Sequence, residues 1–213
     1  MTEPGAETPA AMTPAGEARR FVVATFNRHK AAELQALLAL PGVTLVPLAD
    51  WPGATPPEEN GATLLENARF KARAAAALTG LPAIADDTGL EVDALGGAPG
   101  VHAARYSGPG ATYASNVAKL LHELHSVPTE RRSARFRTVC AVAWPDGVEL
   151  SVDGALEGVI TEAPRGENGF GYDPVFIPAG ETRTVAELTD AEKNALSHRA
   201  KAARSLGRLL AKL

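Results

Sequence analysis

The stretch LPAIADDTG, residues 81–89, places a short apolar run directly before two adjacent carboxylates. The apolar part, residues 81–85, predicts a buried β-strand. Asp86 and Asp87 would then stand at the carboxyl end of that strand, where open α/β sheets bind their ligands. The structural alternative for an Asp-Asp-x-Gly sequence is an Asx turn or a helix cap. The stretch therefore bears on both the fold class and the site.

The flanking segments alternate between strand and helix patterns. Apolar runs predict strands at 21–25, 43–48, 135–144, 148–156 and 175–177. The expected helices cover about 29–39 and further stretches that begin at the capping residues Thr63, Thr112, Thr189 and Ser197. A Pro-Asp-Gly turn at 145–147 joins two strands as a hairpin. We therefore expect an α/β fold with a mixed twisted sheet flanked by helices.

The chain shows no internal repeat and no linker between independent domains. Residues 1–18 are rich in Pro, Ala, Gly, Thr and Glu and have little to bury, so we expect a disordered N-terminal extension. The folded domain is then 19–213, a length that suits one α/β domain or two small lobes that share a core.

Charge and composition exclude several classes of protein. The net charge of −4 over 213 residues argues against a nucleic acid polymer as the main partner, since a basic face would be needed. A small phosphorylated ligand remains compatible with a few local cations. Cys140 is the only cysteine, so no internal disulfide forms. With no secretory signal and no apolar run long enough to span a membrane, we expect a cytoplasmic protein.

A polar segment between the first strand and the first helix is a candidate phosphate site. Backbone amides at a helix start favour anions, and hydroxyl, amide and ammonium groups beside them suit a polyphosphate. The segment lacks the glycines of a Walker A loop, and an ordinary strand-to-helix turn with polar caps is the alternative. Its residues are Thr25, Phe26, Asn27, Arg28, His29 and Lys30.

The carboxylates are candidate metal ligands. Two adjacent carboxylates repel each other unless a cation or a proton lies between them. Mg²⁺ prefers hard oxygen ligands and takes one or two carboxylates together with substrate phosphates. Glu58 and Glu59, in a Pro- and Gly-rich loop, are further candidates, with a solvated pair of loop charges as the alternative.

Two later segments carry side chains suited to a ligand, the first to a nucleoside and the second to an anion. Glycines in GFGYDP, residues 169–174, let the backbone approach a ligand, and the aromatic rings offer a stacking face. Near the C-terminus, Lys193, His198 and Arg199 form a second polar cluster. We expect these cations near helix starts, where the dipole disfavours them unless an anionic ligand compensates. A core-capping loop and a solvated helix face are the respective alternatives.

Taken in order, these segments resemble the non-canonical purine nucleoside triphosphate pyrophosphatases, the inosine triphosphate pyrophosphatase family. Each piece is weak alone, but the ordered set extends over nearly the whole chain from residue 21. The matching pieces are TFNRHK (25–30), EENG (58–61), ENARFKA (66–72), IADDTGLEVDALGGAPGVHAARYSG (84–108), ARFRT (134–138), GFGYDPVF (169–176), AELT (186–189) and EKNALSHR (192–199).

The resemblance implies a fold of two lobes with a nucleotide cleft between them, and a protein that forms a homodimer. It also implies that a nucleoside triphosphate and water give the monophosphate and pyrophosphate. The expected substrates are purines with a 6-keto group, ITP, dITP and XTP, and the role is to keep deaminated purines out of DNA and RNA.

The resemblance also implies roles for single residues. Asp87 is the expected catalytic carboxylate, and Asp87, Asp86 and Glu58 are the expected ligands of Mg²⁺, with Glu59 a weaker candidate. Phosphates would be held by residues 25–30, although Phe26 stands where many relatives have a small residue. The remaining substrate contacts expected are Thr88, Phe170, Gly171, Tyr172, Asp173, Lys193, His198 and Arg199.

Two other functions fit the same residues. One is a related pyrophosphatase acting on other modified or pyrimidine nucleotides, as in a structurally similar septum-associated family. The other is a regulatory module that binds a nucleotide without turnover. The presence of Asp86, Asp87 and Lys30 argues against the second.

Overall fold

The computed structural model describes residues 19–38, 42–56 and 59–212. The predicted extension at 1–18 and Glu58 lie outside these ranges. The strands form one mixed sheet in the order β2-β1-β3-β5-β6-β7, with β4 paired to β3. They are β1 (Arg19–Val23), β2 (Val43–Pro47), β3 (Ala83–Val92), β4 (Pro99–Gly100), β5 (Ser133–Ala143), β6 (Glu149–Ile160) and β7 (Phe176–Pro178). β1 runs parallel to β2 and β3, and the other pairs are antiparallel, which confirms the mixed sheet.

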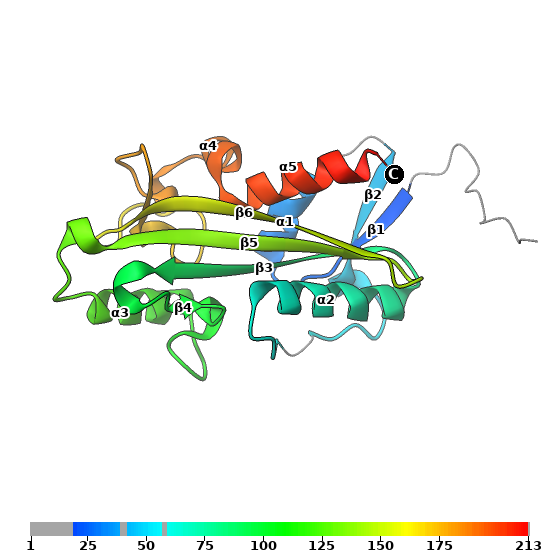
Figure 1. Cartoon of the computed structure of the whole chain (residues 1–213), viewed down its shortest axis with the longest axis horizontal. Helices are drawn as coiled ribbons and strands as arrows, with labels where there is room; N and C mark the ends of the chain where they lie inside the picture. The colour runs from blue at the N-terminus through cyan, green and yellow to red at the C-terminus, as the bar shows by residue number, and fades with distance from the viewer. Residues whose placement is uncertain (1–18, 39–41, 57–58, 213) are drawn as a thin grey trace, which may run out of the picture.

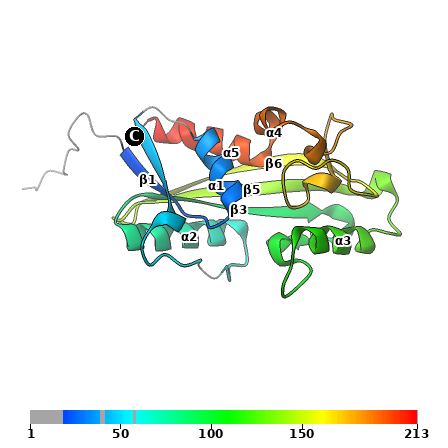
Figure 2. The same ribbon diagram turned by 180° about the vertical axis from the view of Figure 1, so that it is seen from behind.

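Helices cover both faces of this sheet (Figures 1 and 2). α2 and α3 lie against one face, and α1, α4 and α5 lie on the other. Their bounds are α1 (Arg28–Leu37), α2 (Leu64–Thr79), α3 (Tyr113–Glu123), α4 (Asp190–Leu196) and α5 (His198–Leu210). Cys140 is buried in β5, as expected of a core residue. Within the described residues, no helix combines the length and apolar character needed to cross a membrane.

The predicted helix starts are largely confirmed. Thr112 and Ser197 cap α3 and α5, and Thr189 forms a complete capping box with Glu192. At α2, which Thr63 caps, only half of a capping box is present. The Thr63 hydroxyl accepts from the amide of Glu66 at 3.1 Å, but the carboxylate of Glu66 accepts from the amide of Ala62 instead of that of Thr63.

The prediction that a strand ends at Asp86-Asp87 is wrong. β3 continues through both carboxylates to Val92, because β5 pairs with it along its whole length. Its parallel neighbour is much shorter, and the β1–β3 pairing stops at Val23 and Ile84. The carboxylates therefore lie just beyond the end of β1, in the middle of a long strand.

Candidate active site

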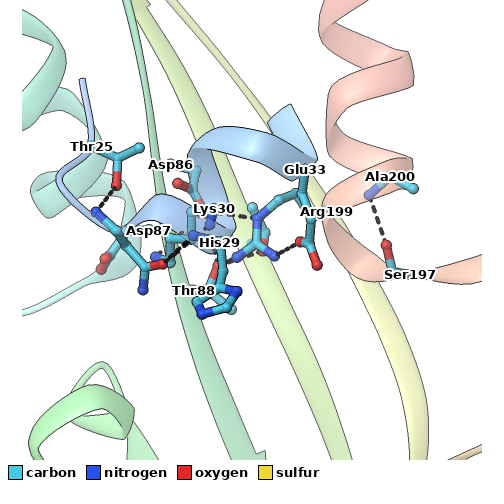
Figure 3. A network of polar contacts seen from close by, with 12 residues as sticks. Thr25, His29, Lys30, Glu33, Asp86, Asp87, Thr88, Ser197, Arg199 and Ala200 are labelled. Atoms are coloured by element: carbon cyan, nitrogen blue, oxygen red, sulfur yellow. Dashed lines mark hydrogen bonds and ion pairs between the residues drawn. The ribbon is translucent and has the colours of Figure 1, made fainter. Parts of the chain in front are cut away.

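Asp86 and Asp87 project to opposite faces of the sheet, since successive side chains of a strand alternate. Asp86 faces α1 and α5. Its Oδ2 accepts from Arg199 Nε at 3.2 Å and lies 3.5 Å from Lys30 Nζ. Asp87 faces α2, where Lys71 Nζ donates to Oδ1 at 2.9 Å. The expected repulsion between the neighbouring carboxylates is therefore relieved by cations on both faces. Lys30 and Arg199 lie beside Asp86 (Figure 3), and Lys71 lies beside Asp87.

The two carboxylates differ in acidity. Burial alone would raise the pKa of Asp86, but the charges of Lys30, Arg199 and Lys71 hold that pKa well below its usual range. For Asp87 burial prevails, and its pKa is raised even though Lys71 and Lys30 oppose the shift. A carboxylate with a raised pKa is better suited to accept a proton than its neighbour is.

Asp87 is held by two residues to which sequence reasoning gave no role. Asn67 Nδ2 donates to Oδ2 at 3.1 Å, and Lys71 donates both to Asp87 and to Glu59, the latter at 2.7 Å. Burial lowers the pKa of Lys71, but Asp87, Asp86 and Glu59 together raise it, so the lysine stays charged. The available signal was a polar pair at i and i+4 on the alanine-lined, buried face of a helix.

The side chain of Asn27 caps the start of α1. Asn27 Oδ1 accepts from the amides of His29 and Lys30, at 3.1 and 3.2 Å. Thr25 Oγ1 accepts from the amide of Asn27 at 3.2 Å. The polar turn foreseen as the structural alternative is therefore present, and Lys30 also points to the carboxylates.

A cavity opens beside this turn and brings together most of the predicted residues. Those that line it are Asn27, Lys30, Thr88, Phe170, Gly171, Tyr172, Asp173, Lys193, His198 and Arg199. Its wall also includes Gly89, Ala103, Ala104, Tyr113, Asn116 and Phe136, which sequence reasoning did not select. Of the other predicted residues, Thr25, Phe26, Arg28, His29, Asp86 and Asp87 do not line it. Phe26 packs against the apolar cluster beneath α2, and the side chain of Arg28 is exposed.

The segment at 170–173 is fixed by internal hydrogen bonds. Tyr172 Oη donates to the carbonyl of Ala103 at 2.9 Å. Asp173 Oδ2 accepts from the amide of Phe170 and from Lys193 Nζ, each at 2.9 Å. Burial raises the pKa of Asp173 despite the nearby charge of Lys193. Tyr172 and Asp173 thus shape the wall of the cavity.

We expected Lys193 and Arg199 near helix starts, where the helix dipole disfavours a cation, and this holds for Arg199 only. Lys193 lies in the last turn of α4, where the dipole favours a cation, so that part of the prediction is wrong. Arg199 lies in the first turn of α5, where the dipole disfavours it. Asp86 and Glu33 compensate, and Glu33 bonds both Arg199 and, at 2.7 Å, Lys193. Glu33, which sequence reasoning overlooked, thus ties α1 to both C-terminal helices.

His198 is a neutral side chain in the cavity wall. Its ring stacks on Phe136 with centroids 4.7 Å apart, and its buried Nδ1 has no hydrogen-bond partner among the residues that the structure describes. Burial, followed by the charges of Arg199 and Lys193, places the pKa of His198 well below its usual range. The imidazole is therefore available to a ligand as a neutral donor and acceptor.

Together, these features define an α/β protein whose cavity suits an anionic ligand with an apolar part. The chain belongs to the Ham1 family, whose model matches residues 21–209. It is 52% identical over 184 residues to the dITP/XTP pyrophosphatase of Geobacillus kaustophilus, covering 86% of this chain and 90% of that protein. It is also 52% identical over 196 residues to the protein of the same name from Symbiobacterium thermophilum, with 92% and 97% covered.

Solved structures carry the same fold. A HAM1 protein from Coxiella burnetii superposes with a TM-score of 0.84 at 43% identity and covers 92% of this chain and all (100%) of its own. The nucleoside-triphosphatase / dITP/XTP pyrophosphatase from Mycobacterium abscessus gives a TM-score of 0.73 at 48% identity and covers 88% and 98%. The α/β prediction and the family resemblance are confirmed.

Proposed function

We propose that this chain hydrolyses non-canonical purine nucleoside triphosphates, such as dITP, ITP and XTP, to the monophosphate and pyrophosphate. The observation that carries the proposal is the identity of about half of all residues, over nearly the full length, to proteins named dITP/XTP pyrophosphatase. The activity would keep deaminated purines out of DNA and RNA.

Asp87 is the proposed general base. Its raised pKa favours proton uptake from an attacking water, and its two oxygens are oriented by Lys71 and Asn67. Lys71 acts as a positioning residue, because it fixes Asp87 and Glu59 from the α2 side.

Lys30 and Lys193 would bind the phosphates. Lys30 contacts Asp86, and Lys193 contacts Glu33 and Asp173. A triphosphate would compete with these carboxylates for the same cations, so binding exchanges internal ion pairs for ion pairs with the substrate. Charge-assisted hydrogen bonds of this kind stabilise the charge that develops on a phosphoryl group.

Mg²⁺ fits the oxygen ligands present. In the part of the chain that the structure describes, no group of three or more His, Cys, Asp or Glu side chains is arranged as a metal site. That is compatible with an ion that takes few carboxylates and several phosphate oxygens. Within the described ranges, Asp86 Oδ1 is buried and has no hydrogen-bond partner, as expected of an atom that could bind an ion. We propose Asp86, Asp87 and Glu58 as ligands, and the ion would neutralise phosphate charge.

His198 and Arg199 are the proposed discriminators of the base. A neutral imidazole can donate a hydrogen bond to a 6-keto oxygen. Adenine presents an amino group at that position and would leave the donor unpaired, at a cost of about 1–3 kcal/mol. The two-lobed cleft, the homodimer and the cytoplasmic location implied by the sequence stay predictions.

Pyrophosphate release from dITP and dATP, each with Mg²⁺ and with a chelator, tests the proposal. We expect rapid release from dITP with Mg²⁺, slow release from dATP and none with the chelator. Release of orthophosphate instead would move cleavage to the terminal bond and refute the assignment. Binding of dITP without release would favour the regulatory module.

A further inference from the structure

Three aromatic side chains from distant parts of the sequence meet at the edge of the cavity. His29, near the start of α1, stacks on Phe170 with ring centroids 5.2 Å apart and an interplanar angle of 25°. Tyr113, at the start of α3, lies 5.9 Å from the same ring. We call His29, Tyr113 and Phe170 the aromatic clasp. It connects the predicted phosphate segment with the predicted nucleoside segment.

A hydrogen bond joins the same two sides of the cavity. Asn27 Nδ2 donates to Tyr113 Oη at 3.3 Å. Asn27 also caps α1 through the amides of His29 and Lys30, so the clasp is anchored to the first turn of that helix.

The contacts of His29 argue against a phosphate-binding role. Its side chain is exposed and does not line the cavity. Among the residues that the structure describes, none accepts or donates a hydrogen bond at its ring nitrogens. In Figure 3 the ring points away from Asp86, and its ring contact is the stack on Phe170.

Two cations, Lys193 and Arg199, also lie over the ring of Phe170. Lys193 Nζ lies 4.6 Å and the guanidinium carbon of Arg199 5.7 Å from the ring centroid. Both cations are buried and fixed by ion pairs with carboxylates. The exposed His29 and Tyr113 are therefore the neighbours of Phe170 that can move without breaking a buried ion pair.

The size of the cavity requires such a movement. Its volume is about 90 Å³, whereas pockets for ligands of nucleotide size have roughly 300–1,000 Å³. Substrate entry must widen the cavity, and the clasp closes its exposed edge.

We propose that His29 is a positioning residue for the nucleobase: by stacking on Phe170, it holds that ring as the wall against which the base binds. The inference rests on the proposed nucleotide substrate, but it removes His29 from the phosphate-binding set predicted from the sequence. The stack, and not a charge or a hydrogen bond, is the property that matters.

Three substitutions separate stacking from phosphate contact. His29→Ala removes the ring, His29→Phe keeps a stacking ring without nitrogens, and His29→Lys supplies a cation without a ring. His122→Ala is the matched control, because His122 is an exposed histidine that stacks on a ring remote from the site, that of His125.

The dissociation constant of dIMP is measured together with KM and kcat for pyrophosphate release from dITP. We expect His29→Ala and His29→Lys to weaken dIMP binding and raise KM by roughly 3- to 10-fold, with His29→Phe within about twofold of wild type. We expect kcat to change little. Rescue by lysine but not by phenylalanine, or unchanged dIMP binding in His29→Ala, would overturn the proposal.

The dIMP measurement does not depend on turnover. A wild-type protein that binds dIMP but releases no pyrophosphate would refute the proposed function and leave the clasp to be judged by the variants. A wild-type protein that does not bind dIMP would overturn the clasp proposal itself.

Discussion

Replacing Asp87 by asparagine tests the assignment of the general base with almost no change in side-chain size. Lys71 donates to one oxygen of Asp87 and Asn67 to the other, at 2.9 and 3.1 Å. The new amide has a single acceptor oxygen, so its NH₂ group must face one of these donors. Asn67 cannot simply turn over, because its own Oδ1 accepts from the amide of Gly61 at 2.8 Å.

The cost to stability follows from that mismatch. One buried donor left unpaired costs about 1–3 kcal/mol, and removal of the buried charge of Asp87 offsets part of it. A domain with about 5–15 kcal/mol of stability stays folded after such a loss. Turnover should fall much further, by roughly 10²- to 10⁴-fold, because a positioned base contributes that much.

The assay is pyrophosphate release from dITP at saturating Mg²⁺, with urea unfolding of the same preparations. Asp153→Asn is the matched control, since Asp153 is an exposed aspartate on β6 of the same sheet. It should change neither quantity. A folded Asp87→Asn protein with kcat within about tenfold of wild type would refute the reasoning.

Three further substitutions have defined outcomes. Lys71→Met should move the acidic limb of the pH profile of kcat/KM to higher pH, because Lys71 opposes the rise in the pKa of Asp87; an unmoved limb would contradict the assignment. The folded state keeps His198 neutral, so below about pH 6.5 only the unfolded state binds a proton at this residue. As the pH is lowered from about 6.5, His198 should therefore reduce the free energy of unfolding of the wild type by about 1.4 kcal/mol per pH unit. Urea unfolding between pH 5 and 8 should show that this one-proton contribution is missing in His198→Asn. Gly154→Ala would place a Cβ 2.3 Å from the carbonyl of His198 and 2.6 Å from the amide of Ala202, so thermal unfolding should report a loss of about 1–3 kcal/mol and KM for dITP should rise.

Local signals were sufficient for much of the fold. The caps at Thr112, Thr189 and Ser197 were predictable because a hydroxyl that satisfies first-turn amides acts within three residues. The hairpin at 145–147 was predictable for the same reason, since its turn residues specify the backbone directly. The mixed sheet followed from the order of such elements.

The site itself depends on contacts that no local pattern contains. Aspartate is rare in strands, so a strand end at Asp86 was the natural expectation. The strand continues because β5 pairs with it throughout. It can carry the two carboxylates because Arg199, 113 residues later in the chain, bonds one of them and Lys71 bonds the other. Likewise, the stack of His29 on Phe170 joins segments whose sequences give no sign of one another.

The balance of charge in the site bears on the proposed metal. Four largely buried cations, Lys30, Lys71, Lys193 and Arg199, meet five carboxylates, Glu33, Glu59, Asp86, Asp87 and Asp173. With every group ionised, this cluster carries one net negative charge, and counting the exposed Arg105 near Glu59 brings the sum to zero, with no positive charge left over for a substrate. A triphosphate entering such a site would gain cations only by leaving buried carboxylates unpaired, at several kcal/mol for each ion. A divalent cation that enters with the substrate supplies the missing charge, so the requirement for metal follows from the protein's own ion pairs and should persist with any nucleotide base.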